Sequence, residues 1–342
     1  MPTASHASWS HHATADTVPP EPIPPKSPSK LNAPSTQAGQ GLVTRSLSGF
    51  ITVHTDEGRT LTCKLRGKLK QERQRSEIVV AGDRVRFETQ SETEGTIVEV
   101  LPRTSTIMRK EVGPRGAHFD DLIVVNLDLL VITGAATSPT LQPGLVDRFL
   151  VIAELGHVKP LLVITKCDVP DPSFEDELKL HIQTYRNMGV EVIETSVRTG
   201  LGMDALRARL EGKISAFMGK SGAGKSSLLN AIDPQFALAV GDVSDALKKG
   251  THTTRVASLH PFGKGWLVDT PGLRELGVPE LNAHDLTACF PEMRSRGRCK
   301  YTTCAHENEK GCAMREGIAT GEIAASRLDS FRKLLRGEPH GG

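Results

Sequence analysis

The chain has 342 residues, of which 24% are charged and 38% are hydrophobic, a composition typical of proteins that bury a core of normal size. The formal net charge of +2 is too small to identify a nucleic-acid or membrane partner, because a sum over the chain hides local clusters. No apolar run approaches the ~18 residues of a membrane span, and the amino terminus lacks the charged-then-apolar pattern of a signal peptide. Both observations predict a cytoplasmic protein without a membrane partner.

Residues 1–40 are rich in Pro, Ser, Thr and Ala and carry almost no large apolar side chains. Such a segment cannot offset the entropy lost on ordering. We therefore expect a disordered tail, in which the scattered histidines are solvated.

Residues 41–105 contain five short β-type runs, separated by turn signals such as Asp56-Glu57-Gly58. This spacing predicts a small barrel, with an OB-fold as the leading candidate. The basic run at residues 64–75 carries six cations and one Glu. Alone it is typical of a solvated loop, but on a barrel of this type it equally suggests a contact with RNA.

Residues 106–278 change to buried strands that alternate with helices, the pattern of an α/β domain with a parallel sheet. One helix is predicted over 173–188, with Ser173 and Asp176 spaced as a capping box and Gly189 as its end. Another is predicted over 203–210. In such a fold, functional residues follow the carboxyl ends of the strands.

A phosphate-binding loop follows the strand predicted at 213–218 and precedes the helical run at 226–232. Glycines let backbone N–H groups surround a phosphate, Lys225 neutralises the β and γ oxygens, and Ser226 reaches Mg²⁺. The alternative, a plain glycine turn, does not explain why the strand, loop and helix occur in this order. The predicted phosphate-binding residues are Gly219, Lys220, Ser221, Gly222, Ala223, Gly224, Lys225, Ser226 and Ser227.

Two further segments match the base-reading motifs of GTPases. Thr165-Lys166-Cys167-Asp168 follows an apolar strand, and a carboxylate at Asp168 accepts hydrogen bonds from guanine donors that adenine lacks. Lys166 is expected to lie across the base, while Thr165 stands where Asn is usual and makes fewer bonds. Ser196 and Val197 stand where a Ser-Ala pair supports the guanine oxygen.

The two switch elements of a GTPase follow the phosphate loop. Thr254 closes the run that begins at Gly250 and is predicted to bind Mg²⁺. Asp269 and Gly272 form a D-x-x-G turn toward the γ-phosphate. Leu273 cannot orient water, so His252 is our candidate catalytic residue; the alternative is that its ring packs against the switch or a partner.

The order of these motifs is unusual, because the base-reading segments at 165–168 and 196–197 precede the phosphate loop. The sequence therefore predicts a circularly permuted GTPase domain. A permuted sheet keeps the same site in space, since termini tolerate relocation to loops. The segment after Gly272 leads directly into the carboxy-terminal domain, so movement of that switch is expected to displace it.

Four metal-ligand residues lie within fourteen positions near the carboxy terminus. Three thiolates and one imidazole make a complete tetrahedral set with no position open to water, which predicts one structural Zn²⁺. A mainly helical domain over 279–342 is too short for a large core, and zinc supplies part of its stability. Arg294, Arg296, Arg298 and Lys300 flank this segment as a phosphate-contacting surface would. The predicted ligands are Cys299, Cys304, His306 and Cys312, whereas Cys63, Cys167 and Cys289 are expected to be inert thiols.

From about residue 41 to 335 the chain resembles the small-ribosomal-subunit biogenesis GTPase family RsgA, also called YjeQ. The resemblance rests on GxSGxGKSS at 219–227, the switch at 250–254, D-x-P-G at 269–272, FPE at 290–292 and the zinc segment at 299–313. It implies an OB-fold, a permuted GTPase domain and a zinc domain that bind the 30S subunit and its 16S rRNA. It also implies GTP hydrolysis stimulated by the subunit and coupled to release, with the switch histidine assisting.

Departures from the family pattern occur at Thr165 and beside the switch, at Thr251 and Arg255. The leading hypothesis is a monomeric, ribosome-activated GTPase. An RNA-binding scaffold that holds nucleotide without hydrolysing it, and a P-loop ATPase or kinase, are the alternatives. Asp168 argues against the last of these.

Overall fold

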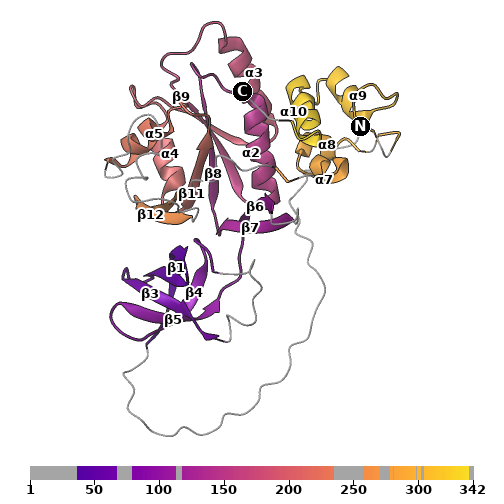
Figure 1. Ribbon diagram of the computed structural model, residues 1–342. Helices are drawn as coiled ribbons and strands as arrows, with labels where there is room; N and C mark the ends of the chain where they lie inside the picture. The colour runs from indigo at the N-terminus through magenta and orange to yellow at the C-terminus, as the bar shows by residue number, and fades with distance from the viewer. Residues whose placement is uncertain are drawn as a thin grey trace, which may run out of the picture. The chain divides into compact units, whose positions relative to one another are not determined.

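The computed structural model describes residues 37–67, 79–112, 118–234, 257–269, 278–279, 281–297, 299–301 and 304–338 (Figure 1). Most of the predicted tail therefore lies outside the described residues. Its last part does not belong to a tail, because residues 38–40 begin the first strand and pair with residues 86–88. The apolar signal in that strand starts only at Leu42, which is why the sequence placed the boundary too late.

The amino-terminal strands form a closed five-stranded barrel, as predicted. The strands pair in the order β1-β2-β3-β5-β4, and β4 returns to β1. The β3–β5 pair is parallel and the other pairs are antiparallel. Val43, Val53 and Phe87 are among the buried side chains that fill the barrel. The strands are β1 (Ala38–Leu47), β2 (Phe50–Thr55), β3 (Thr60–Leu65), β4 (Arg84–Thr89) and β5 (Glu94–Val100).

The central sheet is parallel apart from one edge, which confirms the predicted α/β class. Its order is β10-β9-β8-β11-β13-β12, and only β12 runs antiparallel to its neighbour β13. A separate hairpin, β6 (Thr106–Val112) with β7 (His118–Val125), precedes it. The sheet strands are β8 (Leu129–Ala135), β9 (Lys159–Thr165), β10 (Glu191–Glu194), β11 (Ile214–Gly219), β12 (Ser258–Phe262) and β13 (Gly265–Asp269).

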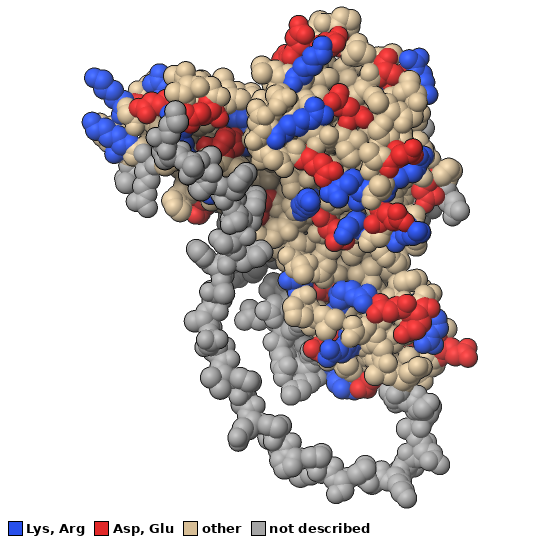
Figure 2. All heavy atoms as spheres, turned by 180° about the vertical axis from the view of Figure 1, so that it is seen from behind, with Lys and Arg blue, Asp and Glu red and all other residues tan. Residues whose placement is uncertain are grey.

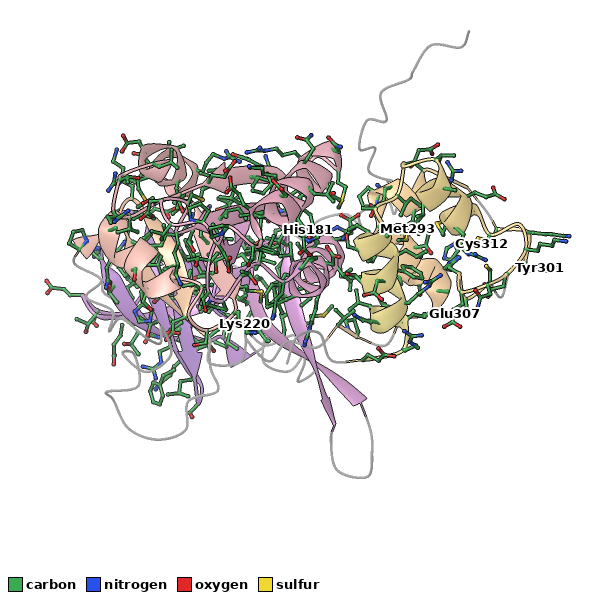
Figure 3. The ribbon with its side chains drawn as sticks, turned by 90° about the horizontal axis from the view of Figure 1, so that it is seen from above. His181, Lys220, Met293, Tyr301, Glu307 and Cys312 are labelled. Carbon is green, nitrogen blue, oxygen red and sulfur yellow. The ribbon has the colours of Figure 1, made fainter. Side chains whose placement is uncertain are left out.

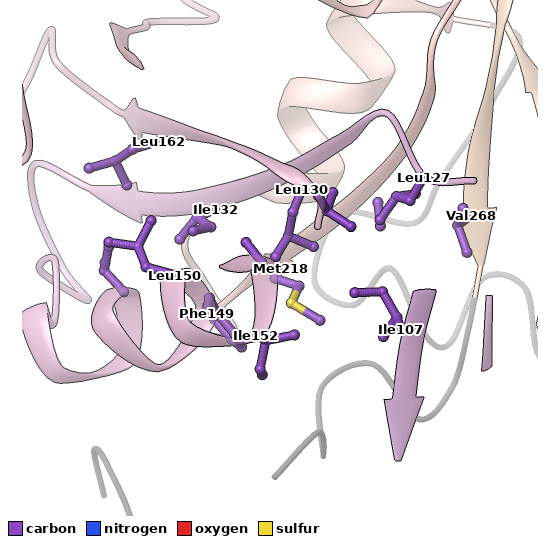
Figure 4. Close-up of a cluster of buried hydrophobic side chains, with 14 of the residues drawn as sticks. Ile107, Leu127, Leu130, Ile132, Phe149, Leu150, Ile152, Leu162, Met218 and Val268 are labelled. Atoms are coloured by element: carbon purple, nitrogen blue, oxygen red, sulfur yellow. The ribbon is translucent and has the colours of Figure 1, made fainter. Parts of the chain in front are cut away.

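Helices cover both faces of this sheet, and the central strand explains why. Every residue of β8 is buried, and alternate side chains enter two different cores. Leu130 and Ile132 join the core shown in Figure 4, which includes Phe149 of helix α2. The opposite core contains Val131 together with side chains of α4 and α5. The helices are α2 (Pro143–Leu155), α3 (Glu175–Asn187), α4 (Met203–Leu210) and α5 (Lys225–Ile232).

The predicted capping box of α3 is wrong. The helix begins at Glu175, with Phe174 at its amino-terminal cap and no side-chain cap bond. The Ser173 hydroxyl instead donates to Asp171 Oδ1 at 2.6 Å, so a local Asp-Ser turn uses the group that the capping box required. Leu178, Ile182 and Tyr185 are among the buried side chains of this helix.

The carboxy-terminal segment is mainly helical, as predicted, and has a small core of its own. That core includes Val151 of α2, so the last helix packs on both the segment with the predicted metal ligands and the central α/β domain. The last helix begins at Ala325, and its Leu328 and Phe331 side chains are buried. No helix in the described ranges is long and apolar enough to cross a membrane. The helices are α7 (Ala283–Ala288), α8 (Pro291–Arg294), α9 (Ala313–Ala319) and α10 (Ala325–Leu335).

Candidate functional site

The predicted motifs meet where the parallel strands of the central sheet reach their carboxyl ends. β9 ends at Thr165, β11 at Gly219 and β13 at Asp269. The register pairs Ala135 with Thr165, while Thr133 pairs with Gly219. Loops that are more than fifty residues apart in sequence therefore leave the sheet side by side, as expected for a ligand site in an α/β fold.

The phosphate loop depends on glycine at both of its ends. Gly219 has φ of +146°, and a Cβ there would lie 2.2 Å from Thr133 Oγ1. Gly224 has φ of +85° and caps α5, whose first residue is Lys225. The amino end of that helix therefore follows directly from the loop, which is the arrangement that favours an anion.

Lys225 lies folded into the loop. Its ammonium donates to the carbonyl oxygens of Gly219 at 2.8 Å and of Lys220 at 2.7 Å, and the residue is buried. Lys220 is labelled in Figure 3. Ser226 is also buried, in the first turn of α5. Its hydroxyl is a hard oxygen donor of the kind that Mg²⁺ accepts beside bound phosphates, so this end of the loop fits the metal that a nucleotide brings.

The base-reading loop is bonded directly to the phosphate loop. The Thr165 hydroxyl donates to the Ala223 carbonyl at 2.6 Å, and the residue is buried. Lys166, in a left-handed conformation with φ of +59°, donates to the carbonyls of Gly222 at 2.9 Å and Ser138 at 2.7 Å. Thr165 therefore supports the neighbouring loop even though it carries fewer polar atoms than the Asn it replaces.

Both carboxylate oxygens of Asp168 have partners in the structure. The Ser196 hydroxyl donates to Oδ1 at 2.6 Å, and Arg198 Nε lies 2.7 Å from Oδ2. The Ser196 bond is the largest effect that lowers the pKa of Asp168 below its ordinary value, and the backbone N–H of Asp168 and then the charge and hydrogen bond of Arg198 add to it. Asp168 is therefore an anion at neutral pH, which is the state that accepts guanine donors. Val197 is exposed beside it.

The switch residues fall mostly outside the described part of the chain. Asp269 is described and ends β13, paired with Ser258 of β12. Thr254, Gly272 and the catalytic candidate His252 lie outside the described residues, as do Leu273, Thr251 and Arg255. Their predicted roles stay predictions.

The four predicted metal ligands come together in the carboxy-terminal domain. One donor atom from each lies within 4.8 Å of the others. His306 Nδ1 is 3.4 Å from the sulfurs of both Cys299 and Cys312. Burial lowers the pKa of His306, so its imidazole is neutral and presents a lone pair. The donor set and its closeness fit one tetrahedral, thiolate-rich metal site.

Helix α10 packs against this cluster through contacts with His306. The Phe331 ring contacts the His306 ring edge-on, with 5.2 Å between centroids, and Arg332 donates to the His306 carbonyl. His306 itself has φ of +62°, a left-handed conformation held by these contacts. The ligand geometry is thus fixed by packing as well as by any ion.

The predicted basic surface beside the cluster is smaller than expected. Arg294 pairs with Glu154 at 3.5 Å, and Arg296 pairs with Glu322, so both guanidinium groups are used within the protein. Arg298 lies outside the described residues. Lys300 lies 5.4 Å from the ring centroid of Tyr301, which projects away from the helices in Figure 3.

The three remaining cysteines behave as the sequence analysis expects. All are free thiols, and burial raises the pKa of Cys63, Cys167 and Cys289 to about 11. Neighbouring carboxylates add to the effect at Cys167 and Cys289. Thiolate is therefore scarce at neutral pH, and these residues are unreactive.

Sequence reasoning missed a buried ion cluster between the domains. Arg327 on α10 is 2% exposed and pairs with Asp147 of α2 at 2.6 Å and with Glu292 of α8 at 2.7 Å. The Tyr185 hydroxyl donates to Asp147 Oδ1 at 2.9 Å. Burial alone would lower the pKa of Arg327, but the two carboxylates raise it above its ordinary value. The available signal was Asp147 itself, a carboxylate that lies among the apolar residues of the buried face of α2.

Thr133, Ser138 and Arg198 were also missed. Thr133 donates to the Met218 carbonyl at 2.7 Å beneath the phosphate loop, and Ser138 accepts from Lys166. Two of them follow or end a buried strand, which is where ligand-site residues collect. Arg198 directly follows a predicted base-reading pair.

Two family models match the chain and decide its classification. The RsgA GTPase model covers residues 100–279, and the RsgA N-terminal domain model covers residues 40–97. The chain belongs to the RsgA GTPase family. The resemblance stated from the sequence is thereby confirmed, and membership makes the chain a GTP hydrolase with a circularly permuted domain.

Curated relatives and solved structures agree with this assignment. A small ribosomal subunit biogenesis GTPase RsgA from Gemmatimonas aurantiaca is 38% identical over 303 residues, covering 87% of this chain and 97% of the relative. Its Geobacillus kaustophilus counterpart is 38% identical over 293 residues, covering 85% and 94%. YjeQ from Thermotoga maritima superposes with a TM-score of 0.71 at 31% identity, covering 88% of this chain and 98% of that one. YloQ, described as a circularly permuted GTPase, gives 0.66 at 28% identity, covering 88% and 94%.

Proposed function

We propose that this RsgA-family GTPase acts in late maturation of the small ribosomal subunit, binds the 30S subunit and its 16S rRNA, hydrolyses GTP when the subunit stimulates it, and leaves on hydrolysis. The names of its curated relatives support the biogenesis role.

One observation carries the nucleotide site. The base-reading and phosphate loops are joined by the Thr165–Ala223 and Lys166–Gly222 hydrogen bonds. Two bonds between loops hold the distance between a base-binding carboxylate and a phosphate-binding ammonium, so one nucleotide can span both. Asp168 then selects guanine because it accepts from N1–H and the 2-amino group.

In the proposed reaction, water attacks the γ-phosphorus of GTP and GDP leaves as the P–O bond breaks. Lys225 binds the phosphate oxygens, and Ser226 and Thr254 hold Mg²⁺, which neutralises developing charge when bound. Asp269 and Gly272 present the switch turn to the γ-phosphate. His252 orients the attacking water, a role for a side chain outside the described residues.

External stimulation is expected because Leu273 supplies no group to orient water. Unaided small GTPases turn over at roughly 10⁻⁴ to 10⁻² s⁻¹, and activation of about 10⁵-fold corresponds to roughly 7 kcal/mol. A subunit that orders the two switches can provide this. In the sequence, the D-x-x-G turn that ends at Gly272 leads directly into the carboxy-terminal domain, which would link movement of this switch to release.

The proposed RNA contact belongs to the barrel. Barrels of this type often carry oligonucleotides, and the basic run at 64–75 begins at the end of β3. Within the described part of that run, Arg66 pairs with Glu88 at 2.5 Å, and Lys64 lies over the exposed Phe50 ring. Figure 2 shows acidic and basic side chains interspersed over the visible face, so a broad single-sign field does not explain recognition from that side.

The Cys299, Cys304, His306 and Cys312 site is proposed to hold one structural Zn²⁺. Zinc bound there would fix the loop between α8 and α9. A cytoplasmic location follows from a ribosomal partner and agrees with six free cysteines. The monomeric state stays a prediction.

The test is GTP turnover by the zinc-loaded protein with and without 30S subunits, with ATP and 50S subunits as controls. Stimulation of a hundredfold or more by 30S alone is the expected result, and His252→Ala should remove most of it. Tight GTP binding without stimulation would favour a nucleotide-binding scaffold. Hydrolysis of ATP would contradict the guanine assignment to Asp168.

A further inference from the structure

An arginine pairs with Asp168, the carboxylate that is expected to bind guanine. Arg198 Nε lies 2.7 Å from Oδ2, while the Ser196 hydroxyl bonds Oδ1. Guanine presents two donors, N1–H and the 2-amino group, to the same carboxylate. With both oxygens already paired, base binding requires that one partner yields or shares.

The two partners differ in how easily they can leave. Ser196 is fully buried and its Oγ also accepts from the Thr199 amide at 3.1 Å, so its hydroxyl is fixed by two bonds. The Arg198 side chain is 71% exposed, and water solvates its guanidinium once it moves away. An ionised carboxylate offers about four lone-pair sites, so the Ser196 bond leaves room for a base donor on Oδ1. Of the two partners, Arg198 is therefore the one that yields more easily.

We propose that Arg198 is a placeholder that pairs with the base-reading carboxylate of Asp168 in the nucleotide-free protein and is displaced when guanine binds. The inference rests on the proposed guanine site. The placeholder keeps a partly buried carboxylate paired between nucleotides. It also makes each binding event break one ion pair, so it lowers the affinity for GDP and GTP.

The expected size of this effect follows from the exposure of the pair. Exposed ion pairs contribute about 0.2–1 kcal/mol, which converts to about a 1.5- to 5-fold change in an equilibrium constant. Because the guanidinium is released before the base is seated, the change belongs to the association rate. The dissociation rate should stay the same, since a displaced side chain makes no contact with the bound base.

The test uses stopped-flow binding of a fluorescent GDP analogue to the full chain. Arg198→Ala should raise the association rate constant about 1.5- to 5-fold and leave the dissociation rate constant unchanged. Arg86→Ala is the matched control, because it removes an exposed arginine that pairs with Glu99 in the barrel at 2.7 Å. It should change neither rate.

A second arm separates the placeholder from the site itself. Asp168→Asn replaces an acceptor by an amide donor, so the preferred base should change from guanine to xanthine. In that background Arg198 has no carboxylate to pair with, and Arg198→Ala should leave binding of a xanthosine diphosphate analogue unchanged.

Four outcomes would overturn the inference. Faster dissociation in Arg198→Ala would mean that the arginine contacts the bound nucleotide. Unchanged association would mean that the pair does not compete with guanine. An equal gain in the Asp168→Asn background would mean that Arg198 acts through another group. Failure of Asp168→Asn to change the base preference would instead overturn the guanine assignment, and the inference with it.

Discussion

Replacing Arg327 by methionine should destabilise the contact between α10 and the GTPase domain by about 3–5 kcal/mol, the cost of leaving buried charge without its partner. Asp147 is 0% exposed at its side chain and Glu292 is 11% exposed, so neither carboxylate can be solvated in place. Methionine keeps much of the length of the side chain but none of its charge. Lost stacking of the guanidinium on Phe290, 4.2 Å from the ring centroid, adds to the effect.

Hydrogen–deuterium exchange of the α10 amides measures this loss locally. A decrease of 3–5 kcal/mol in the free energy of opening corresponds to exchange about 150 to 5,000 times faster. Lys333→Met on the same helix removes only an exposed pair with Asp329 and should change exchange by less than about threefold.

A rescue variant tests the cause. Arg327→Met combined with Asp147→Asn and Glu292→Gln removes the unpaired charges, and should recover most of the protection lost in the single variant. Unchanged exchange in Arg327→Met would refute the reasoning outright. No recovery in the triple variant would assign the loss to packing on Phe290 rather than to charge.

Four other predictions concern the two sites. Thr165→Val leaves the Ala223 carbonyl without its donor, so GDP binding measured by a fluorescent titration should weaken by about 1–2 kcal/mol, or roughly 5- to 30-fold. The control variant Thr165→Ser keeps the hydroxyl and should retain most of the affinity. Lys225→Ala removes a charged donor and should weaken GTP binding by about 1.5–3 kcal/mol, with equal affinities arguing against the phosphate assignment. Native mass spectrometry should find one zinc per chain. Cys312→Ser or a strong chelator should remove the zinc and make the carboxy-terminal domain sensitive to limited proteolysis. An unchanged digest would show that packing alone holds that domain. The pKa of Asp168 is lowered in the folded protein, so the contribution of its ionised carboxylate is fully present above the unfolded pKa of about 3.9 and is lost as the pH falls through the folded pKa. GDP affinity measured between pH 5.5 and 8 should therefore show no step attributable to Asp168.

Much of the fold could be predicted because its strands are short apolar runs with clear ends. All five barrel strands and the parallel strands of the sheet lie where their runs lie in the sequence. Errors occurred where a local polar group had two possible partners. Ser173 could cap a helix or bond Asp171, and only the geometry of the turn decides between them.

The candidate site was predictable in its motifs but not in its connections. The phosphate and base-reading motifs are recognisable in the sequence by residue type and spacing, whereas the Thr165–Ala223 bond depends on which strands are neighbours in the sheet. The same holds for Arg327, whose partners come from two other helices. Arg294 and Arg296 show the opposite error, since basic residues counted as a surface turned out to be paired internally.

The permuted order also affects how the nascent chain folds. Strand β8 lies at the centre of the sheet and is buried along its whole length, yet its neighbour β11 is far along the chain, with Thr133 and Met218 separated by 85 residues. At roughly 5–20 residues per second, translation needs about 4–17 s to supply that partner. During this time β8 can pair with β9 on one side only. Until β11 is made, the other edge of β8 is a hydrophobic strand edge with unpaired backbone groups, which can act as a template for aggregation.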